Sequence, residues 1–256
     1  MSGFRRVDRG RWHDYSLDGR KLPGVTTIIN KAVPKPALID WSSRVAAEWA
    51  VDHIDVLERL GRDAAVDTIK TESRRRNDAA KMRGTDVHAL AQRVAEGQEV
   101  HVPDDLVGYL DAYLTFWHDW HVEPIVVEAS CVNRRWYYAG TFDLLARLAG
   151  REIPDMIDVK TGERVYRETC LQIAAYRHAE HWLDSAGVEQ PMPATGGGYA
   201  LLLDPGGTYE LVPVESGDEM FAVFLHAAYV AAFVDRKGDD DPVGLPLAPP
   251  APAIAS

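Results

Sequence analysis

The chain has 256 residues, of which 46% are hydrophobic and 26% charged, which is the composition of an ordinary globular protein. No apolar run reaches the roughly 20 residues of a membrane helix, and no apolar signal core follows the basic N-terminus. We therefore expect a cytoplasmic protein with no membrane partner. Two cysteines, Cys131 and Cys170, are too few for a disulfide framework, and free thiols are favoured over a single bridge.

The net charge of −11 argues by itself against a nucleic-acid partner, because phosphate binding depends on basic surfaces. Two basic runs weaken that argument. The first run opens the chain and consists of Arg5, Arg6, Arg9, Arg11, Arg20 and Lys21. The second run precedes Gly84 and consists of Arg74, Arg75, Arg76, Lys81 and Arg83. Each run is either a DNA-contacting surface or a solvated face, and charge alone does not decide between the two.

The N-terminal part, residues 1–121, is predicted to be mainly helical. A Pro-Gly turn signal followed by β-branched residues over 22–30 fits either a short strand or the start of a helix. Apolar residues then recur at helical spacing in three stretches, which predict helices over 36–60, over 72–96 with Gly97 as its end, and over 103–121.

After residue 121 the pattern changes to strands. We predict strands over 125–132, 137–149 and 155–160, a helix over 168–183, a loop over 190–198, a hairpin of strands 199–203 and 208–214, and a last helix over 221–234. The sum is an α/β or α+β fold with a central mixed sheet and flanking helices, in one domain over 1–235. The acidic and then Pro/Ala-rich tail over 236–256 is predicted to be disordered.

The pattern Asp143, then Asp158-Val159-Lys160, carries the first candidate chemistry. The two aspartates fall on consecutive predicted strands joined by a turn, which can bring their carboxylates together. Side chains alternate along a strand, so Asp158 and Lys160 share one face. Such a group is costly amid apolar residues unless a metal or ion pairing compensates. Taken alone, the pattern fits an exposed Asp–Lys pair as well as it fits a catalytic site.

Three further residues extend the pattern. His88 lies in a predicted helix, and Gln172 and Tyr176 lie four residues apart on the helix after the Asp-x-Lys strand, so both face the end of that strand. Hydrolysis of a phosphodiester needs an activated water and stabilisation of negative charge, which carboxylate-bound divalent metals and a nearby lysine supply. A lone helical histidine is more often structural, so the order and spacing of the whole set carry the interpretation.

The whole set resembles the RecB-like branch of the PD-(D/E)xK nucleases over residues 22–183. The motifs that carry the resemblance are G-x-x-x-H over 84–88, G-x-x-D over 140–143, D-x-K over 158–160 and Q-x-x-x-Y over 172–176. Residues 22–29 and 34–41 look like the start of phage-encoded members. The resemblance implies a restriction-endonuclease-like core and a bacteriophage-type exonuclease, acting in the host cytoplasm if a phage encodes it.

The resemblance also implies a ligand set. His88, Asp143 and Asp158 would ligate Mg²⁺ or Mn²⁺, and the carbonyl of Val159 would be a further ligand. Glu128 matches a carboxylate that serves a second metal, although it can equally be a charge at the edge of a strand. Asp158 stands where many members have glutamate, which reaches further.

Outside the ligand set, Lys160 would position the attacking water or stabilise the developing charge. Gln172 and Tyr176 would hold the site or the DNA backbone. Many relatives carry four cysteines for an iron–sulfur cluster, and two cysteines do not suffice, so no cluster is expected. Phe142 replaces the proline of the family name.

The function implied is a metal-dependent DNA exonuclease of recombination or replication, with DNA as substrate and a single-strand annealing or replication protein as a candidate partner. Two alternatives stay open: a non-catalytic DNA-binding module of the same fold, and a structure-specific endonuclease. Two other patterns carry less weight. They are histidines at zinc-compatible helical spacing, His118 with His121 and His178 with His181, and tryptophans that stack bases or, more simply, fill the core, namely Trp117, Trp120 and Trp182.

Overall fold

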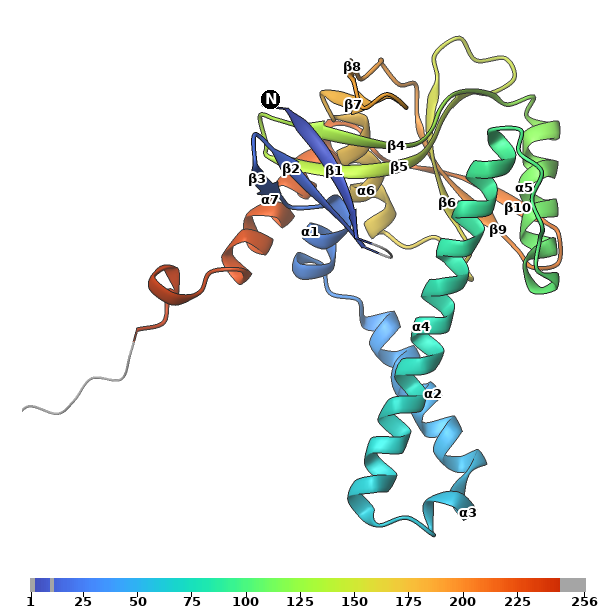
Figure 1. The fold of residues 1–256 in the computed structure, drawn as a ribbon, viewed down its shortest axis with the longest axis vertical. Coiled ribbons are helices and arrows are strands. Elements are labelled where there is room, and N and C mark those ends of the chain that lie inside the picture. The colour runs from blue at the N-terminus through green and yellow to red at the C-terminus, as the bar shows by residue number, and fades with distance from the viewer. Residues whose placement is uncertain (1–2, 10–11, 245–256) are drawn as a thin grey trace, which may run out of the picture.

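A computed structural model describes residues 3–9 and 12–244 of the chain. These residues form an α+β fold with one three-stranded antiparallel sheet, one seven-stranded mixed sheet and helices on both faces of the larger sheet (Figure 1). The predicted combination of a central mixed sheet with flanking helices is therefore confirmed at the level of fold class.

The chain begins with a small sheet where a mainly helical part was predicted. Its strands, in spatial order, are β1 (Phe4–Arg9), β2 (Trp12–Leu17) and β3 (Arg20–Leu22). Asp18 and Gly19 both have positive φ, at 52° and 80°, and an Asp-Gly pair of that kind is the strongest short-range signal for a hairpin. The sheet forms because Phe4, Tyr15 and Leu17 bury their side chains against Val132 and Ala139 of the larger sheet.

The helices of the N-terminal part are α1 (Val25–Ala32), α2 (Pro36–Asp52), α3 (Ile54–Leu57) and α4 (Arg62–Ala95). The stretch over 22–30 contains the start of α1, which confirms the helix start, one of the two alternatives predicted there. The helix predicted over 36–60 is instead broken at His53, and α4 begins ten residues before the predicted start at 72. In Figure 1, α2, α3 and the first half of α4 project from the body as an arm in which α2 packs on α4. Most side chains of the arm are exposed, so the apolar spacing from which the helix ends were predicted is a weak guide there.

The larger sheet contains every strand predicted after residue 121. Its strands are β4 (Glu123–Asn133), β5 (Tyr138–Arg147), β6 (Asp155–Lys160), β7 (His181–Leu183), β8 (Glu189–Pro191), β9 (Gly198–Leu203) and β10 (Tyr209–Val214), in the order β10-β9-β6-β5-β4-β7-β8. Only the β6–β9 pairing among them is parallel. The remaining helical elements are η1 (Asp104–Leu106), α5 (Val107–Asp119), α6 (Glu168–Arg177), α7 (Asp218–Val234) and η2 (Gly238–Asp240).

The helix predicted over 168–183 is wrong in its second half, because α6 ends at Arg177 and β7 follows. The carbonyl of His178 accepts a 2.7 Å bond from the Asn133 side chain, and the N–H of Glu180 donates to the Val132 carbonyl. These bonds to the edge of β4 draw the chain out of the helix. The histidines at 178 and 181 therefore do not share a helix face, and the ring of His178 instead stacks on Phe221 at 4.2 Å between centroids.

Helices cover the two faces of the larger sheet differently. One face packs on α1, α6 and α7 in a continuous apolar core. The other face is divided, since α4 and α5 cover the β6–β9 side and the small sheet covers the far ends of β4 and β5. Polar side chains of β4 and β5 lie between these two covers, and this division positions the candidate site.

Some smaller predictions also have an outcome. Cys131 and Cys170 are both free thiols. The tail predicted to be disordered begins with the short helix η2, and its residues 245–256, like Arg11 of the first basic run, lie outside the described residues. Within the part of the chain that is described, no helix combines the length and the apolar character needed to cross a bilayer.

Candidate active site

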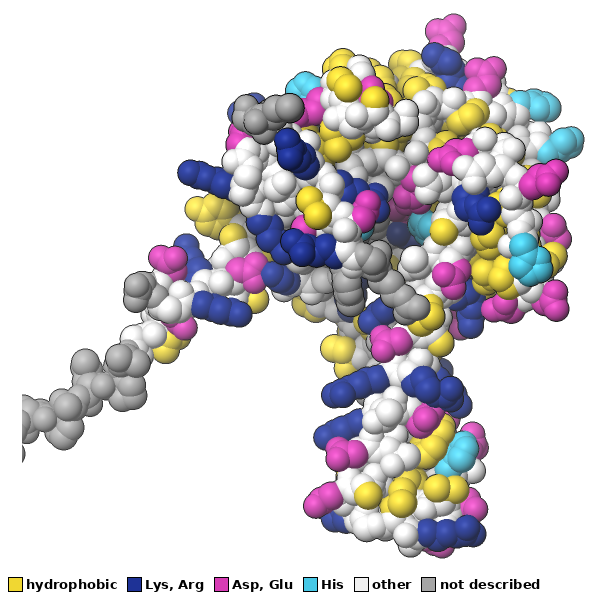
Figure 2. All heavy atoms as spheres, in the orientation of Figure 1, with side chains coloured by type: hydrophobic (Ala, Val, Ile, Leu, Met, Phe, Trp, Pro, Cys, Tyr) yellow, Lys and Arg dark blue, Asp and Glu magenta, His cyan; other side chains and the backbone are white. Residues whose placement is uncertain are grey.

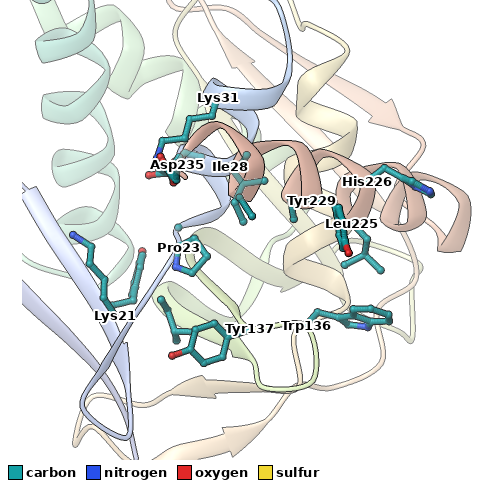
Figure 3. Close-up of a pocket in the computed structure, with 18 of the residues that line it drawn as sticks. Lys21, Pro23, Ile28, Lys31, Trp136, Tyr137, Leu225, His226, Tyr229 and Asp235 are labelled. Carbon is teal, nitrogen blue, oxygen red and sulfur yellow. Dashed lines mark hydrogen bonds and ion pairs between the residues drawn. The ribbon is translucent and has the colours of Figure 1, made fainter. Parts of the chain in front are cut away.

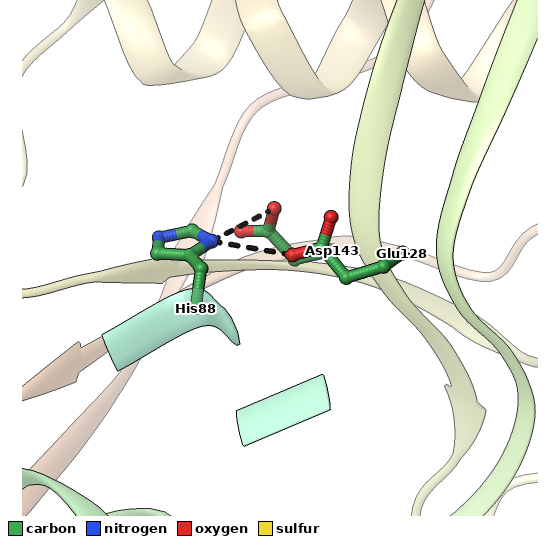
Figure 4. A group of neighbouring side chains, drawn as sticks. All are labelled: His88, Glu128 and Asp143. Carbon is green, nitrogen blue, oxygen red and sulfur yellow. Dashed lines mark ion pairs between the residues drawn. The ribbon is translucent and has the colours of Figure 1, made fainter. Parts of the chain in front are cut away.

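A histidine of the helical part meets two carboxylates of the sheet. The Nδ1 atom of His88, on α4, lies 3.2 Å from Oδ1 of Asp143 on β5 and 3.4 Å from Oε1 of Glu128 on β4 (Figure 4). One ligand atom from each of these three residues lies within 4.8 Å of the other two. Val87 and Leu90 flank the histidine and pack on the larger sheet. This packing fixes the last turns of α4 at the position that brings His88 to the two carboxylates.

The backbone of Glu128 is unusual at this point. Its φ is +49°, a left-handed conformation that is uncommon for a residue other than glycine and costs on the order of 1–3 kcal/mol. Val126 and Ala129, three residues apart, pack in the same core, which the alternation of a regular strand does not allow. The strand therefore switches faces at Glu128, directly across from Asp143, and the switch sets the two carboxylates side by side.

A second group forms around Asp158 on β6. Asp158 is almost fully buried and pairs with the ammonium of Lys160, the next residue on the same face of the strand. The side-chain amide of Gln172 donates to Oδ1 of Asp158 at 2.9 Å and to the Tyr176 hydroxyl at 3.2 Å, while Lys160 donates to Oε1 of Gln172 at 3.2 Å. The face sharing predicted for Asp158 with Lys160, and for Gln172 with Tyr176, is thus observed.

Asp143 joins the two groups. Its Oδ2 accepts a 2.6 Å hydrogen bond from the backbone N–H of Val159, between Asp158 and Lys160. The β5–β6 ladder ends at the Leu144–Ile157 pair, so beyond that point the Asp143 side chain replaces a strand partner for β6. A single carboxylate therefore connects α4, β5 and β6.

The charged groups of the site lie close enough to shift one another's pKa values. Burial opposes protonation of His88, but Asp143 and Glu128 outweigh it and raise the pKa of the imidazole well above its usual value. Burial raises the pKa of Glu128, and burial also raises the pKa of Asp158 despite the adjacent lysine. When His88 is neutral, the three carboxylates and one ammonium leave an excess of two negative charges. One divalent cation would balance that excess.

The geometry of His88, Glu128 and Asp143 fits a divalent cation. Ligands at right angles around a Mg²⁺ ion, each at about 2.0–2.1 Å, lie roughly 3 Å apart. The distances of 3.2 and 3.4 Å from His88 Nδ1 to the two carboxylates are close to that spacing. One imidazole and two carboxylates suit Mg²⁺ and Mn²⁺ and are also acceptable to Zn²⁺, so the donor set does not choose the ion.

The structure brings together most, but not all, of the predicted ligands. His88 and Asp143 meet as expected, whereas Asp158 lies outside the three-residue group because its oxygens face Lys160 and Gln172. Glu128 takes the third place and is not a free charge at a strand edge, since it faces His88. The backbone N–H of Val159 binds Asp143. The proposed metal-ligand roles of Asp158 and of the Val159 carbonyl stay predictions.

A large groove lies elsewhere on the described part of the chain. A groove of about 1120 Å³ runs between α1, the β4–β5 turn and α7, and the aromatic residues Trp136, Tyr137 and Tyr229 are on its wall (Figure 3). Its acidic side chains, Asp14 and Asp235, are already paired with lysines. This groove offers apolar surface, whereas the group of side chains that could hold a metal ion, among the described residues, is the one at His88.

The other histidine and tryptophan patterns have simple outcomes. His118 and His121 lie at the end of α5 with ring centroids 6.4 Å apart, and within the described residues no third zinc ligand joins them. Trp117, Trp120 and Trp182 pack against the apolar cores, as the core-packing interpretation predicts.

Comparison with models of known protein families gives no match, and comparison with curated proteins gives none either.

Gly140 of the G-x-x-D motif is explained by a close approach. A Cβ atom at this position would lie 2.5 Å from the ring of Tyr176, which is buried. At Gly84 of the G-x-x-x-H motif, a Cβ would meet only the Thr161 hydroxyl, at an ordinary 3.4 Å. The sequence pattern flagged both glycines, but only the structure separates their roles.

We expect Gly140→Ala to lower the free energy of unfolding by about 1–3 kcal/mol, because overpacking displaces the Tyr176 ring. Gly84→Ala is the matched control. It lies on a helix, where alanine is favoured over glycine by roughly 1 kcal/mol, so its stability should be unchanged or raised. Urea unfolding followed by circular dichroism measures both, and equal stability of the two variants would contradict the assigned contact.

We also expect Mn²⁺ to raise the Tm of the wild type, since a ligand at 100 times its Kd contributes roughly 2.7 kcal/mol to folding. Glu128→Gln should weaken this gain because one anionic ligand is lost. Glu180→Gln, a carboxylate outside the cluster, should keep it. An undiminished Mn²⁺ effect in Glu128→Gln would show that the carboxylate is not a ligand.

Proposed function

We propose that this chain is a divalent-metal-dependent deoxyribonuclease of the RecB-like PD-(D/E)xK type, and more specifically an exonuclease. The observation that carries the proposal is the double contact of Asp143. One oxygen faces His88, and the other holds the backbone of β6 between Asp158 and Lys160. Three motifs that are far apart in the sequence thus converge on one carboxylate.

The cation would be held by His88, Glu128 and Asp143, and when bound it would supply Lewis acidity and lower the pKa of a bound water. The chain's own groups do the rest. Asp158 and Gln172 hold the Lys160 ammonium in place, where it stabilises negative charge that develops on the phosphate. The Tyr176 hydroxyl supports Gln172 in turn, so the lysine needs little reorganisation during the reaction.

The distribution of charge supports DNA as the substrate despite the acidic total. Residues 1–95 contain 18 of the 28 Lys and Arg residues but only 13 of the 39 Asp and Glu residues. Figure 2 shows Lys and Arg side chains on the arm and on the side of the body formed by β1–β3. The arm contains the first half of α4, the helix that supplies His88, and the small sheet packs on β4 and β5, which supply Glu128 and Asp143. A basic approach to an acidic centre is consistent with a phosphodiester substrate.

We further propose a role in phage-type recombination or replication, in the host cytoplasm, with a single-strand annealing or replication protein as partner. This part of the proposal is supported by the sequence resemblance alone. A non-catalytic DNA-binding module is the first rival, and the intact lysine and ligand positions argue against it. A structure-specific endonuclease is the second.

The test is release of nucleotides from end-labelled linear DNA in Mg²⁺ or Mn²⁺ and its absence in EDTA. Lys160→Ala should lower the rate by about 10²–10³-fold, the usual loss for a group that stabilises transition-state charge. Asp143→Asn should lower it at least as much. Asp119→Asn, an exposed carboxylate on α5, is the control and should keep full activity.

Covalently closed circular DNA separates the exonuclease from the endonuclease. The proposal predicts that the wild type degrades linear DNA and leaves the circle intact. Cleavage of the circle at a comparable rate would favour the endonuclease, and wild-type protein that binds DNA without any metal-dependent cleavage would favour the non-catalytic module.

A further inference from the structure

A layer of hydroxyl groups lies next to the acidic pair, on the same face of the larger sheet. Ser130 and Thr141 are paired across β4 and β5, two residues along from Glu128 and Asp143 respectively. The two hydroxyl oxygens are 3.2 Å apart. Two residues of a strand span about 6.8 Å, so this layer begins within one side-chain length of the cluster that would hold the cation.

The small sheet carries an arginine to this layer. Arg6 of β1 donates from Nη1 to Oγ1 of Thr141 at 3.3 Å, and the Tyr15 hydroxyl of β2 lies 2.8 Å from the same oxygen. The contact is held in place because Phe4, on the same face of β1, and Tyr15 are buried against the larger sheet. Arg6 is also close enough to Glu128 for its charge to lower the pKa of that carboxyl, although burial raises it more.

The Arg6 guanidinium keeps most of its donors for a ligand. It has five N–H groups. Among the described residues its hydrogen-bond partners are Thr141 and Asp8, the latter at 2.8 Å from Nε. About a third of the side chain, 32%, is exposed to solvent. A planar guanidinium with free parallel donors is well suited to a phosphate group, which it can bind with two hydrogen bonds.

We propose that Arg6, seated on Thr141, is a binding site for a DNA phosphate adjacent to the scissile bond. The inference rests on the proposed function and names a substrate contact that the nuclease motifs do not include. Successive charges on one DNA strand rise about 3.4 Å per nucleotide, so a phosphate bound by Arg6 lies one or two nucleotides from the bond at the Asp143 cluster. The small sheet then acts as a clamp that fixes the strand across the site.

A purely structural role for Arg6 is the alternative. In that role Arg6 would be a strut between β1 and β5, or a counter-ion of Glu128, and its loss would lower stability without a specific effect on DNA. The two roles differ in salt dependence, because only a phosphate contact releases counterions. Each phosphate contact adds about 0.7 to the slope of log Kd against log salt for single-stranded DNA and about 0.9 for duplex DNA.

The experiment measures binding of fluorescent DNA by anisotropy, in Mn²⁺ and in a Lys160→Met background in which the proposed function predicts cleavage slowed by about 10²–10³-fold, so that the DNA stays intact during a short measurement. Asp158→Asn is the second background if the first does not fold. Arg6→Ala should weaken binding roughly 5- to 10-fold and lower the salt slope by about 0.7–0.9. Arg5→Ala is the matched control, because Arg5 is the neighbouring exposed arginine of β1 and points to the opposite side. It should change both quantities less than Arg6→Ala does.

A walk of single neutral methylphosphonate linkages along the DNA locates the contact. The protein that retains Arg6 should bind the DNA much more weakly when the neutral linkage stands at one position, one or two nucleotides from the scissile bond. The Arg6→Ala variant should bind that DNA and unmodified DNA equally well. Arg6→Lys should restore part of the affinity, since it keeps the charge but not the two parallel donors.

The outcomes separate the two proposals. If the wild type cleaves DNA while Arg6→Ala and Arg5→Ala bind alike with equal salt slopes, the Arg6 site is wrong and the nuclease proposal stands. If the wild type shows no metal-dependent cleavage, the nuclease proposal fails whatever the binding of Arg6→Ala. Loss of stability in Arg6→Ala with unchanged DNA affinity would establish the structural role instead.

Discussion

The candidate site depends on the largely buried carboxylate of Asp143. One oxygen faces the imidazole of His88 at 3.2 Å, and the other accepts a 2.6 Å bond from the Val159 backbone at the point where the β5–β6 ladder ends. An ionised carboxylate that is mostly withdrawn from water requires such partners. The same requirement favours a bound cation in the cluster. Without a cation, His88 must be protonated to offset the negative charges of Asp143 and Glu128 on either side of it.

Local sequence rules were sufficient for the part of the site that a single element determines. Strand alternation placed Asp158 beside Lys160, and helical periodicity placed Gln172 beside Tyr176. The role of Glu128 was not predictable in the same way, because it depends on the register of β4 against β5 and on a left-handed backbone at one residue. The contacts of Asp158 with Lys160 and Gln172, which compete with metal binding, were not predictable either. The contact with Gln172 depends on how α6 packs on β6, which local sequence rules do not determine.

The fold shows the same division between local and tertiary control. The strands β4, β5, β6, β9 and β10 have strong apolar patterns and were predicted, whereas the short strands β7 and β8 were not. The second half of the 168–183 helix was lost to the edge of β4, whose backbone groups required partners. The Asp18-Gly19 pair, whose residues both have positive φ, is a hairpin signal that can be read from the sequence. That hairpin belongs to the small sheet, which brings positive charge to the border of an acidic centre, and it therefore bears on function as well as fold.

The claim that a histidine of the helical part and carboxylates of the sheet share one cation is tested most directly by electron spin-echo spectroscopy of bound Mn²⁺. The structure predicts modulation from one directly coordinated imidazole nitrogen in the wild type, its loss in His88→Gln and its retention in His178→Gln. Nitrogen modulation that persists in His88→Gln, or that is absent from the Mn²⁺-loaded wild type, would contradict the claim.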